Sequence, residues 1–145
     1  VFGVTDRPGL FDFLANPGTR LEKLLVRTNI PNLVLLPSGA RREGSTELLA
    51  SVRMRELCDE LSARYSDRVV IFDSPPVLAT TTATAIAPLV GQLVLVAEAG
   101  STRHETLRTA VSMLEPFGIT GVVLNKSKQI TKGSYEYYGS YYGVR

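Results

Sequence analysis

The run at positions 68–78 constrains the fold of this chain more than any other stretch. Four consecutive apolar residues, at positions 69–72, precede Asp73, and Ser-Pro-Pro follows the acid. A continuous run of β-branched and aromatic residues is typical of a strand buried on both faces of a parallel sheet. The two prolines cannot donate to a ladder, so they end the strand directly after Asp73. The run therefore predicts an α/β fold with an acid at the carboxyl end of one strand.

The place of Asp73 suggests a function. In open α/β sheets, ligands bind in the crevice beyond the carboxyl ends of the strands. An acid at that edge can hold a metal-bound water beside a nucleotide. The alternative is that Asp73 caps the next turn, since Asp before Ser-Pro often starts one. The spacing of the residues leaves both interpretations open.

Composition bounds the class of protein. A length of 145 residues fits one domain with a real core, and 44% hydrophobic with 21% charged residues is ordinary for a soluble globular protein. The net charge of +2 gives no support to a nucleic-acid partner. The single cysteine, Cys58, excludes an internal disulfide and a cysteine-based zinc site within one chain. The chain begins at Val1 without a signal peptide or membrane-length apolar run, so we expect a cytosolic protein, or a processed or truncated product.

The remaining patterns alternate between strands and helices. Buried strands are predicted at 32–37, 69–72, 92–98 and 119–124. Helices are predicted for one turn after Pro8-Gly9, for a short amphipathic piece within 19–28, from 45 or 46 to about 65, and over 82–90. Another should follow a Thr-x-x-Glu capping box formed by Thr102 and Glu105, and Gly118 should stop it. This alternation predicts a parallel sheet with flanking helices and right-handed crossovers.

The last thirteen residues, 133–145, have an unusual composition. Interspersed glycine and serine predict a flexible tail without a core of its own. The segment also holds five of the chain's six tyrosines: Tyr135, Tyr137, Tyr138, Tyr141 and Tyr142. One interpretation is an aromatic tail that stacks on a partner or on the body of the protein. The other is a phosphorylation tail, in which each phosphate adds roughly −1.5 to −2 charges and opposes self-association.

Several motifs in order now point to a known family. They are the segments 8–14, 36–39, 46–51, 70–76, 91–92 and 123–126, followed by the tyrosine-rich terminus. With them the chain resembles the C-terminal part of the bacterial tyrosine autokinases (BY-kinases) of exopolysaccharide export, and most of all the branch that accompanies exosortase-type loci. The Asp-Ser-Pro-Pro motif and the tyrosine cluster carry the resemblance together, whereas either alone would be a weak signal.

The resemblance implies a partial P-loop NTPase-like domain of the partition-ATPase type at 1–126 and a flexible tail at 127–145. Asp73 would be the Walker B acid that orders Mg²⁺ through a water, and Asn125 would contact the adenine of ATP. The phosphoacceptors would be Tyr135, Tyr137, Tyr138, Tyr141 and Tyr142, modified in trans within a ring of copies. The resemblance also implies a membrane polysaccharide co-polymerase as partner, no nucleic acid, and a cytoplasmic location peripheral to the inner membrane.

The chain also departs from the family pattern. No Gly-x-x-x-x-Gly-Lys-Ser/Thr loop occurs in the 145 residues, and the acidic–basic strand end that normally precedes the Pro8-Gly9 region is missing. We therefore expect Val1 to follow the phosphate-binding half, and the chain alone to be inactive as a kinase. The four strands should keep their parallel order, with the gap closed or filled by another copy. Thr82 stands where the family usually has an acid, which should have a modest effect.

Two other functions are compatible with these residues. A partition-type ATPase without kinase activity would share the fold, but it has no use for a tyrosine tail. A non-catalytic docking module for a membrane co-polymerase would need no phosphate loop. The missing loop favours this second alternative for the chain by itself.

Overall fold

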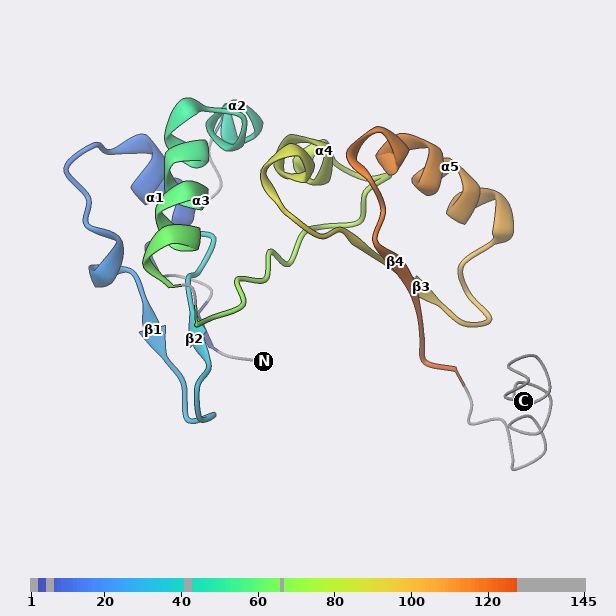
Figure 1. Ribbon diagram of the computed structural model, residues 1–145, viewed down its shortest axis with the longest axis horizontal. Helices are drawn as coiled ribbons and strands as arrows, with labels where there is room; N and C mark the ends of the chain where they lie inside the picture. The colour runs from blue at the N-terminus through green and yellow to red at the C-terminus, as the bar shows by residue number, and fades with distance from the viewer. Residues whose placement is uncertain (1–2, 5–6, 41–42, 66, 128–145) are drawn as a thin grey trace, which may run out of the picture. The chain divides into compact units, whose positions relative to one another are not determined.

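The computed structural model of the protein describes residues 3–4, 7–40, 43–65 and 67–127 (Figure 1). The chain divides between Gly91 and Gln92 into two compact units, and each is described by itself. The tyrosine-rich tail lies outside the described residues. No helix in the described part of the chain has the length and apolar character that a membrane span requires.

The first unit is mainly helical. Its elements are the α-helices α1 (Leu10–Ala15), α2 (Ser45–Leu49), α3 (Val52–Arg64) and α4 (Thr82–Ile86), the 3₁₀ turns η1 (Leu21–Lys23) and η2 (Ala87–Leu89), and the short strands β1 (Val26–Arg27) and β2 (Val34–Leu35). The helical turn predicted after Pro8-Gly9 is therefore confirmed as α1, and the helix predicted over 82–90 is confirmed as α4 followed by η2. In the amphipathic piece only η1 forms, and β1 follows it.

The start of α1 is joined to a distant loop by backbone hydrogen bonds. The N–H of Leu10 donates to the carbonyl of Pro37 at 2.8 Å, and the N–H of Phe11 donates to that of Ser38 at 2.9 Å. The first N–H groups of a helix have no partner inside the helix, so the loop supplies one for two of them. The Asp12 carboxylate accepts the N–H of Gly9 at 2.9 Å. The motifs at 8–14 and 36–39 thus form one structural joint.

The long helix predicted from 45 or 46 to about 65 is wrong, because two helices occupy that span. The break falls at Ala50-Ser51, between α2 and α3. The Ser51 hydroxyl donates to the carbonyl of Leu48 at 2.7 Å and accepts the N–H of Met54 at 3.2 Å. The side chain therefore contacts the end of α2 and caps the start of α3. This is the usual role of serine at a helix N-terminus.

Replacing Ser51 with alanine should lower the free energy of unfolding by about 1 kcal/mol, because the N–H of Met54 loses its capping acceptor. Urea unfolding followed by circular dichroism measures the loss. The control is Ser62→Ala, at an exposed position inside α3, which should leave stability unchanged or slightly raised. Equal behaviour of the two variants would contradict the cap.

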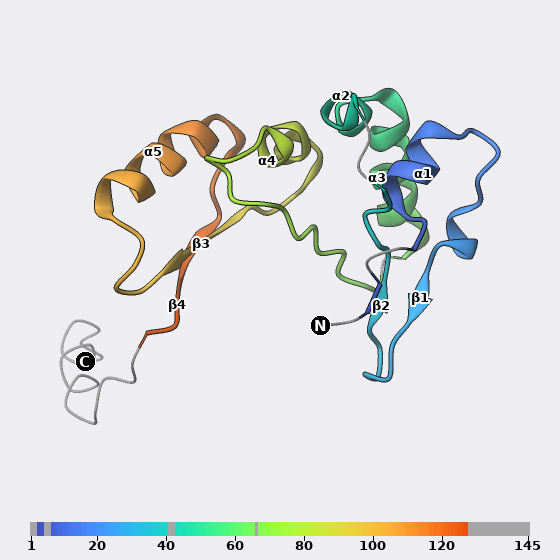
Figure 2. The same ribbon diagram turned by 180° about the vertical axis from the view of Figure 1, so that it is seen from behind.

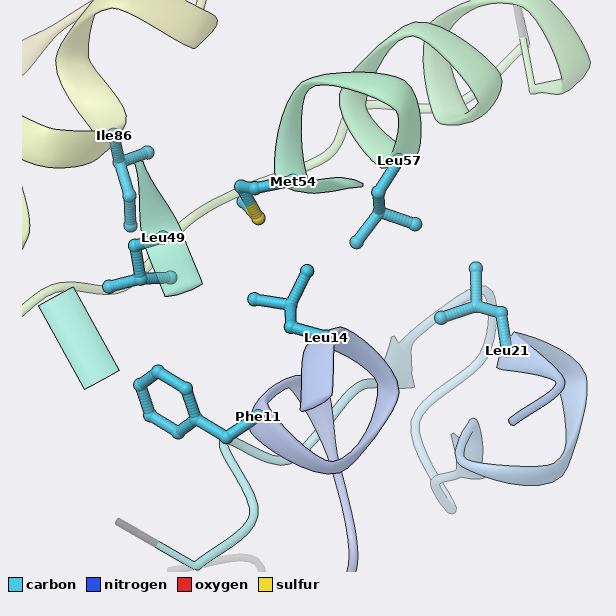
Figure 3. Packing of buried hydrophobic residues seen from close by; sticks show 7 residues of the cluster. All are labelled: Phe11, Leu14, Leu21, Leu49, Met54, Leu57 and Ile86. Carbon is cyan, nitrogen blue, oxygen red and sulfur yellow. The ribbon is translucent and has the colours of Figure 1, made fainter. Parts of the chain in front are cut away.

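The core of the first unit gathers apolar side chains from α1, η1, α2, α3 and α4. Figure 3 shows Leu14 of α1 directed toward Met54 and Leu57 of α3, with Phe11 and Leu49 beside them. The complete buried cluster is Phe11, Leu14, Leu21, Leu49, Met54, Leu57 and Ile86. Met54 is fully buried, and burying a side chain of this size contributes about 1.5–3 kcal/mol. Val52 at the start of α3 is 65% exposed and takes no part in the core.

The strand predicted at 32–37 differs from the structure in length, direction and burial. Only Val34 and Leu35 form a strand, and it pairs antiparallel with β1 in a small hairpin (Figure 1). Asn32 in the connecting turn has a φ of 63°, a left-handed conformation that asparagine tolerates better than most residues. This hairpin was not predicted, because β1 is only two residues long and too short to show an alternating pattern.

The strand predicted at 69–72 is also wrong for the described residues. The segment connects α3 to α4 without a ladder (Figure 1). Val69 is 88% exposed and Ile71 is 83% exposed. β-branched residues favour an extended backbone, but a strand also needs a neighbour to hydrogen-bond with. Among the described residues no strand takes that place, so neither closure of the sheet nor four parallel strands is found.

The second unit contains the parallel sheet that the alternation predicted. Strands β3 (Val94–Glu98) and β4 (Gly121–Asn125) pair in parallel, with Val94 opposite Gly121 and Glu98 opposite Asn125. Helix α5 (His104–Leu114) and the 3₁₀ turn η3 (Glu115–Phe117) connect them, and α5 runs beside the pair in both views (Figures 1 and 2). This confirms the strand–helix–strand unit predicted over 92–124.

The predicted capping box at the start of α5 is wrong. The N-cap is Arg103, one residue later than expected. The hydroxyl of Thr102 instead accepts the N–H of Glu98 at 2.9 Å and so closes the turn that follows β3. A Thr-x-x-Glu pattern does not distinguish a helix cap from such a turn, because threonine serves in both. Gly118, with a φ of 76°, ends the helical segment as predicted.

Candidate functional site

Asp73 is exposed and follows the unpaired segment 69–72. The next turn is closed by the N–H of Ala79, which donates to the carbonyl of Pro76 at 2.9 Å. Within the described part of the chain, no hydrogen bond or ion pair to the Asp73 carboxylate is found, so it does not serve as a turn cap there. The residue is exposed, so an external ligand can reach its side chain.

The donor set around Asp73 fits only one kind of metal site. Among the described residues, no group of three or more His, Cys, Asp and Glu side chains could hold a metal ion. Mg²⁺ in nucleotide sites is usually held by one or two carboxylates together with water and substrate phosphates. A single exposed acid therefore fits magnesium that arrives with a nucleotide, and does not fit an all-protein metal cage.

Asn125 is the last residue of β4, at the carboxyl end of the parallel pair. Its main-chain carbonyl accepts the N–H of Ala99 at 2.9 Å. Its side-chain oxygen, Oδ1, accepts the N–H of Lys126 at 2.8 Å. Asp73 belongs to the first unit and Asn125 to the second.

Two charged residues at this end, Glu98 and Lys126, were given no role from the sequence, although Lys126 belongs to the motif at 123–126. Glu98 is the last residue of β3 and lies opposite Asn125 in the register. The Lys126 ammonium group, Nζ, donates to Glu98 Oε1 at 2.8 Å. Lys126 itself has a φ of 55°, which is uncommon for a residue other than glycine. The positions of Glu98 and Lys126 at the ends of two predicted strands could have suggested that they lie close together. That inference requires the register of the two strands, which the sequence does not give.

The other residues discussed in the sequence analysis have no contact that points to a ligand, or lie outside the described residues. Thr82 begins α4, and the neighbouring Thr81 hydroxyl lies 3.1 Å from that of Thr46. Cys58 is half-buried in α3, and burial, assisted by Asp59, raises the pKa of its thiol. A raised pKa disfavours the nucleophilic thiolate. The five tail tyrosines, Tyr135, Tyr137, Tyr138, Tyr141 and Tyr142, lie outside the described residues.

Comparison with known proteins identifies the relatives of this fold. The chain is 34% identical to the tyrosine-protein kinase Wzc of Salmonella typhi over 97% of its length. Its fold matches the VpsO kinase domain with a TM-score of 0.74 and 33% identity over 85% of the chain. It matches the kinase domain of the Escherichia coli tyrosine kinase ETK with a TM-score of 0.73 and 26% identity over 90% of the chain. The chain is a homologue of the bacterial tyrosine kinases. No protein-family model matches it.

The match to these bacterial tyrosine kinases covers only part of each relative. The chain spans 19% of Wzc, 60% of the VpsO kinase domain and 52% of the ETK kinase domain. The likeness to the tyrosine kinase domains supports the P-loop NTPase-like fold class expected from the sequence, and the parallel β3–β4 pair agrees with it.

Proposed function

We propose that this chain is part of an ATP-dependent bacterial tyrosine autokinase that phosphorylates its own C-terminal tyrosines and regulates exopolysaccharide synthesis and export. The observation that carries the proposal is the likeness to Wzc, which extends over 97% of the chain. The motif Asp-Ser-Pro-Pro at 73–76 and the tyrosine-rich terminus, which fit a kinase and its acceptor, support it further. The exosortase-associated branch belongs to this proposal and rests on sequence resemblance.

Within this proposal, Asp73 holds magnesium through a water, and Asn125 contacts the adenine of ATP. Bound magnesium offsets negative charge on the phosphates during transfer. The exposure of Asp73 supports its role, since the carboxylate is accessible to a nucleotide-bound ion. The position of Asn125 at the carboxyl end of a parallel strand supports the other role, because that edge is where such sheets bind ligands.

The proposal also accounts for the exposed apolar residues at 69–71. The 145 residues contain no Gly-x-x-x-x-Gly-Lys-Ser/Thr loop, and the chain spans about half to three-fifths of the kinase domains it matches. We infer that a further part of the kinase supplies the phosphate loop and covers this segment. Complete burial of Val69, and likewise of Ile71, would contribute about 1.5–3 kcal/mol to the association of this chain with that part. The chain alone, without the loop, would be inactive.

The partners follow from the same proposal. Copies of the kinase in a ring would modify one another's tails, and a membrane polysaccharide co-polymerase would hold the kinase at the cytoplasmic face of the inner membrane. Each phosphotyrosine adds roughly −1.5 to −2 charges, so a fully modified tail would repel its neighbours and open the ring.

Radiolabelled ATP with Mg²⁺ tests the proposal in the full-length protein. We expect label on the tail and nearly complete loss of it when Tyr135, Tyr137, Tyr138, Tyr141 and Tyr142 are all replaced by phenylalanine. The control is Tyr65→Phe, outside the tail, where the ring that Arg68 stacks on is retained and labelling should persist. Hydrolysis without label would instead indicate a partition-type ATPase. If the protein shows neither hydrolysis nor label, the result would indicate the docking module. The absence of a phosphate loop in these residues favours that module for the chain by itself.

A further inference from the structure

The peptide unit between Asn125 and Lys126 is held on both sides. Its carbonyl accepts the N–H of Ala99 at 2.9 Å, and its N–H donates to Asn125 Oδ1 at 2.8 Å. A backbone N–H can only donate, so the amide atom facing it must be the oxygen and not the nitrogen. The hydrogen bond therefore fixes which way the Asn125 amide points.

In this orientation the Asn125 amide has a defined set of hydrogen-bond donors and acceptors left for a ligand. Oδ1 keeps a second lone pair, and Nδ2 keeps its N–H donors without a protein partner among the described residues. Adenine offers a donor at N6 and an acceptor at N7, which an asparagine amide matches in a two-bond contact. Guanine offers two acceptors, O6 and N7, so one of them would face Oδ1. Turning the amide over would not remove this mismatch, because the amide presents one donor and one acceptor in either orientation. It would lose the match to adenine and the bond to the N–H of Lys126.

The ion pair between Glu98 and Lys126 ties this peptide unit to the neighbouring strand. Lys126 Nζ lies 2.8 Å from Glu98 Oε1, and Glu98 is in register with Asn125. The N–H of Glu98 is in turn held by the Thr102 hydroxyl at 2.9 Å. The two strand ends thus form a single linked structure around the Asn125 amide.

We propose that Glu98 and Lys126 are positioning residues that hold the Asn125 amide in the orientation that matches adenine, and so raise the affinity for ATP relative to GTP. This inference rests on the proposed function, since it concerns the base of the same nucleotide. Neither side chain needs to contact the nucleotide. Their contribution is to selectivity between the two bases rather than to the transfer of phosphate.

Competition between ATP and GTP in the full-length protein, with Mg²⁺ present, tests the inference. Loss of an exposed ion pair is worth up to about 1 kcal/mol, so Glu98→Lys and Lys126→Glu should each lower the ratio of ATP to GTP affinity by about three- to fivefold. The double variant restores opposite charges and should recover most of the ratio. We expect KM for ATP to rise while kcat changes little.

The matched control is Glu60→Gln, which removes an ion pair of the same kind. Glu60 pairs with Arg64 at 2.9 Å, and both side chains are about half exposed, as those of Glu98 and Lys126 are. This variant should keep the wild-type ratio. If the wild-type protein prefers ATP and the single variants keep its ratio of ATP to GTP affinity, the inference is overturned and the proposed function stands. A wild-type protein that binds neither nucleotide would overturn both. A fall in the ratio that the double variant does not recover would also contradict the pairing.

Discussion

Replacing Asp73 with asparagine in the full-length protein is expected to reduce labelling of the tail tyrosines by about 100-fold, the upper end of the effect typical of groups that act on a metal through its bound ligands. Asparagine keeps the size of the side chain but loses the negative charge. In the described part of the chain this carboxylate has no structural partner to lose, so folding should be unaffected. The measurement is phosphotyrosine formed from radiolabelled ATP, at several magnesium concentrations.

The magnesium series distinguishes the role of Asp73 from a general loss of activity. If the acid holds magnesium through a water, high magnesium should recover part of the labelling. The control is Asp67→Asn, since Asp67 is another exposed carboxylate close by, in a long contact of 3.8 Å with Arg68. That variant should label as the wild type does. Unaltered labelling of Asp73→Asn would mean that another residue carries the magnesium.

Replacing Gly9 with alanine should have the largest effect on stability. A Cβ at this position would lie 2.6 Å from the main-chain nitrogen of Gly39 and would overlap the carbonyl group of Pro37. Both are backbone atoms that no rotamer change can move. The start of α1 would have to separate from the loop, and the hydrogen bonds from Leu10 and Phe11 would be lost. Overpacking and two lost bonds together cost about 3 kcal/mol or more.

Thermal or urea unfolding of Gly9→Ala measures this loss. Gly18 provides the matched control, because a Cβ there would meet no atom within 4 Å. Gly18→Ala should be neutral or slightly stabilising, since alanine restricts the unfolded chain. Similar stability for the two variants would mean that the 8–14 segment and the 36–39 loop are not closely joined.

The sequence predicted correctly those elements whose formation depends on short-range patterns. α1 is bounded by Pro-Gly signals, and α5 has an apolar stripe that includes the buried Ala110 and Leu114. The β3–β4 pair could be predicted because one helix of suitable length separates two apolar runs, which favours a parallel crossover. In these cases the determining interactions lie close together in the chain.

The errors occurred where a distant partner decides the structure. The run at 69–72 has every local feature of a strand, yet its conformation depends on a neighbour that the described residues do not contain. Ser51 reads as one more polar residue in an amphipathic pattern until its bonds to α2 and α3 are seen. Glu98 and Lys126 are 28 residues apart, and only the register of the two strands brings them together.

The equal register of β3 and β4 makes their lengths as important as their composition. Successive residues of a strand point to opposite faces of the sheet. Deleting or inserting one residue within 121–124 would therefore turn the terminal amide to the opposite face, even though every side chain type was kept. Gene variants that alter the spacing between Gly121 and Asn125 should accordingly be more harmful than most single substitutions among the intervening aliphatic residues.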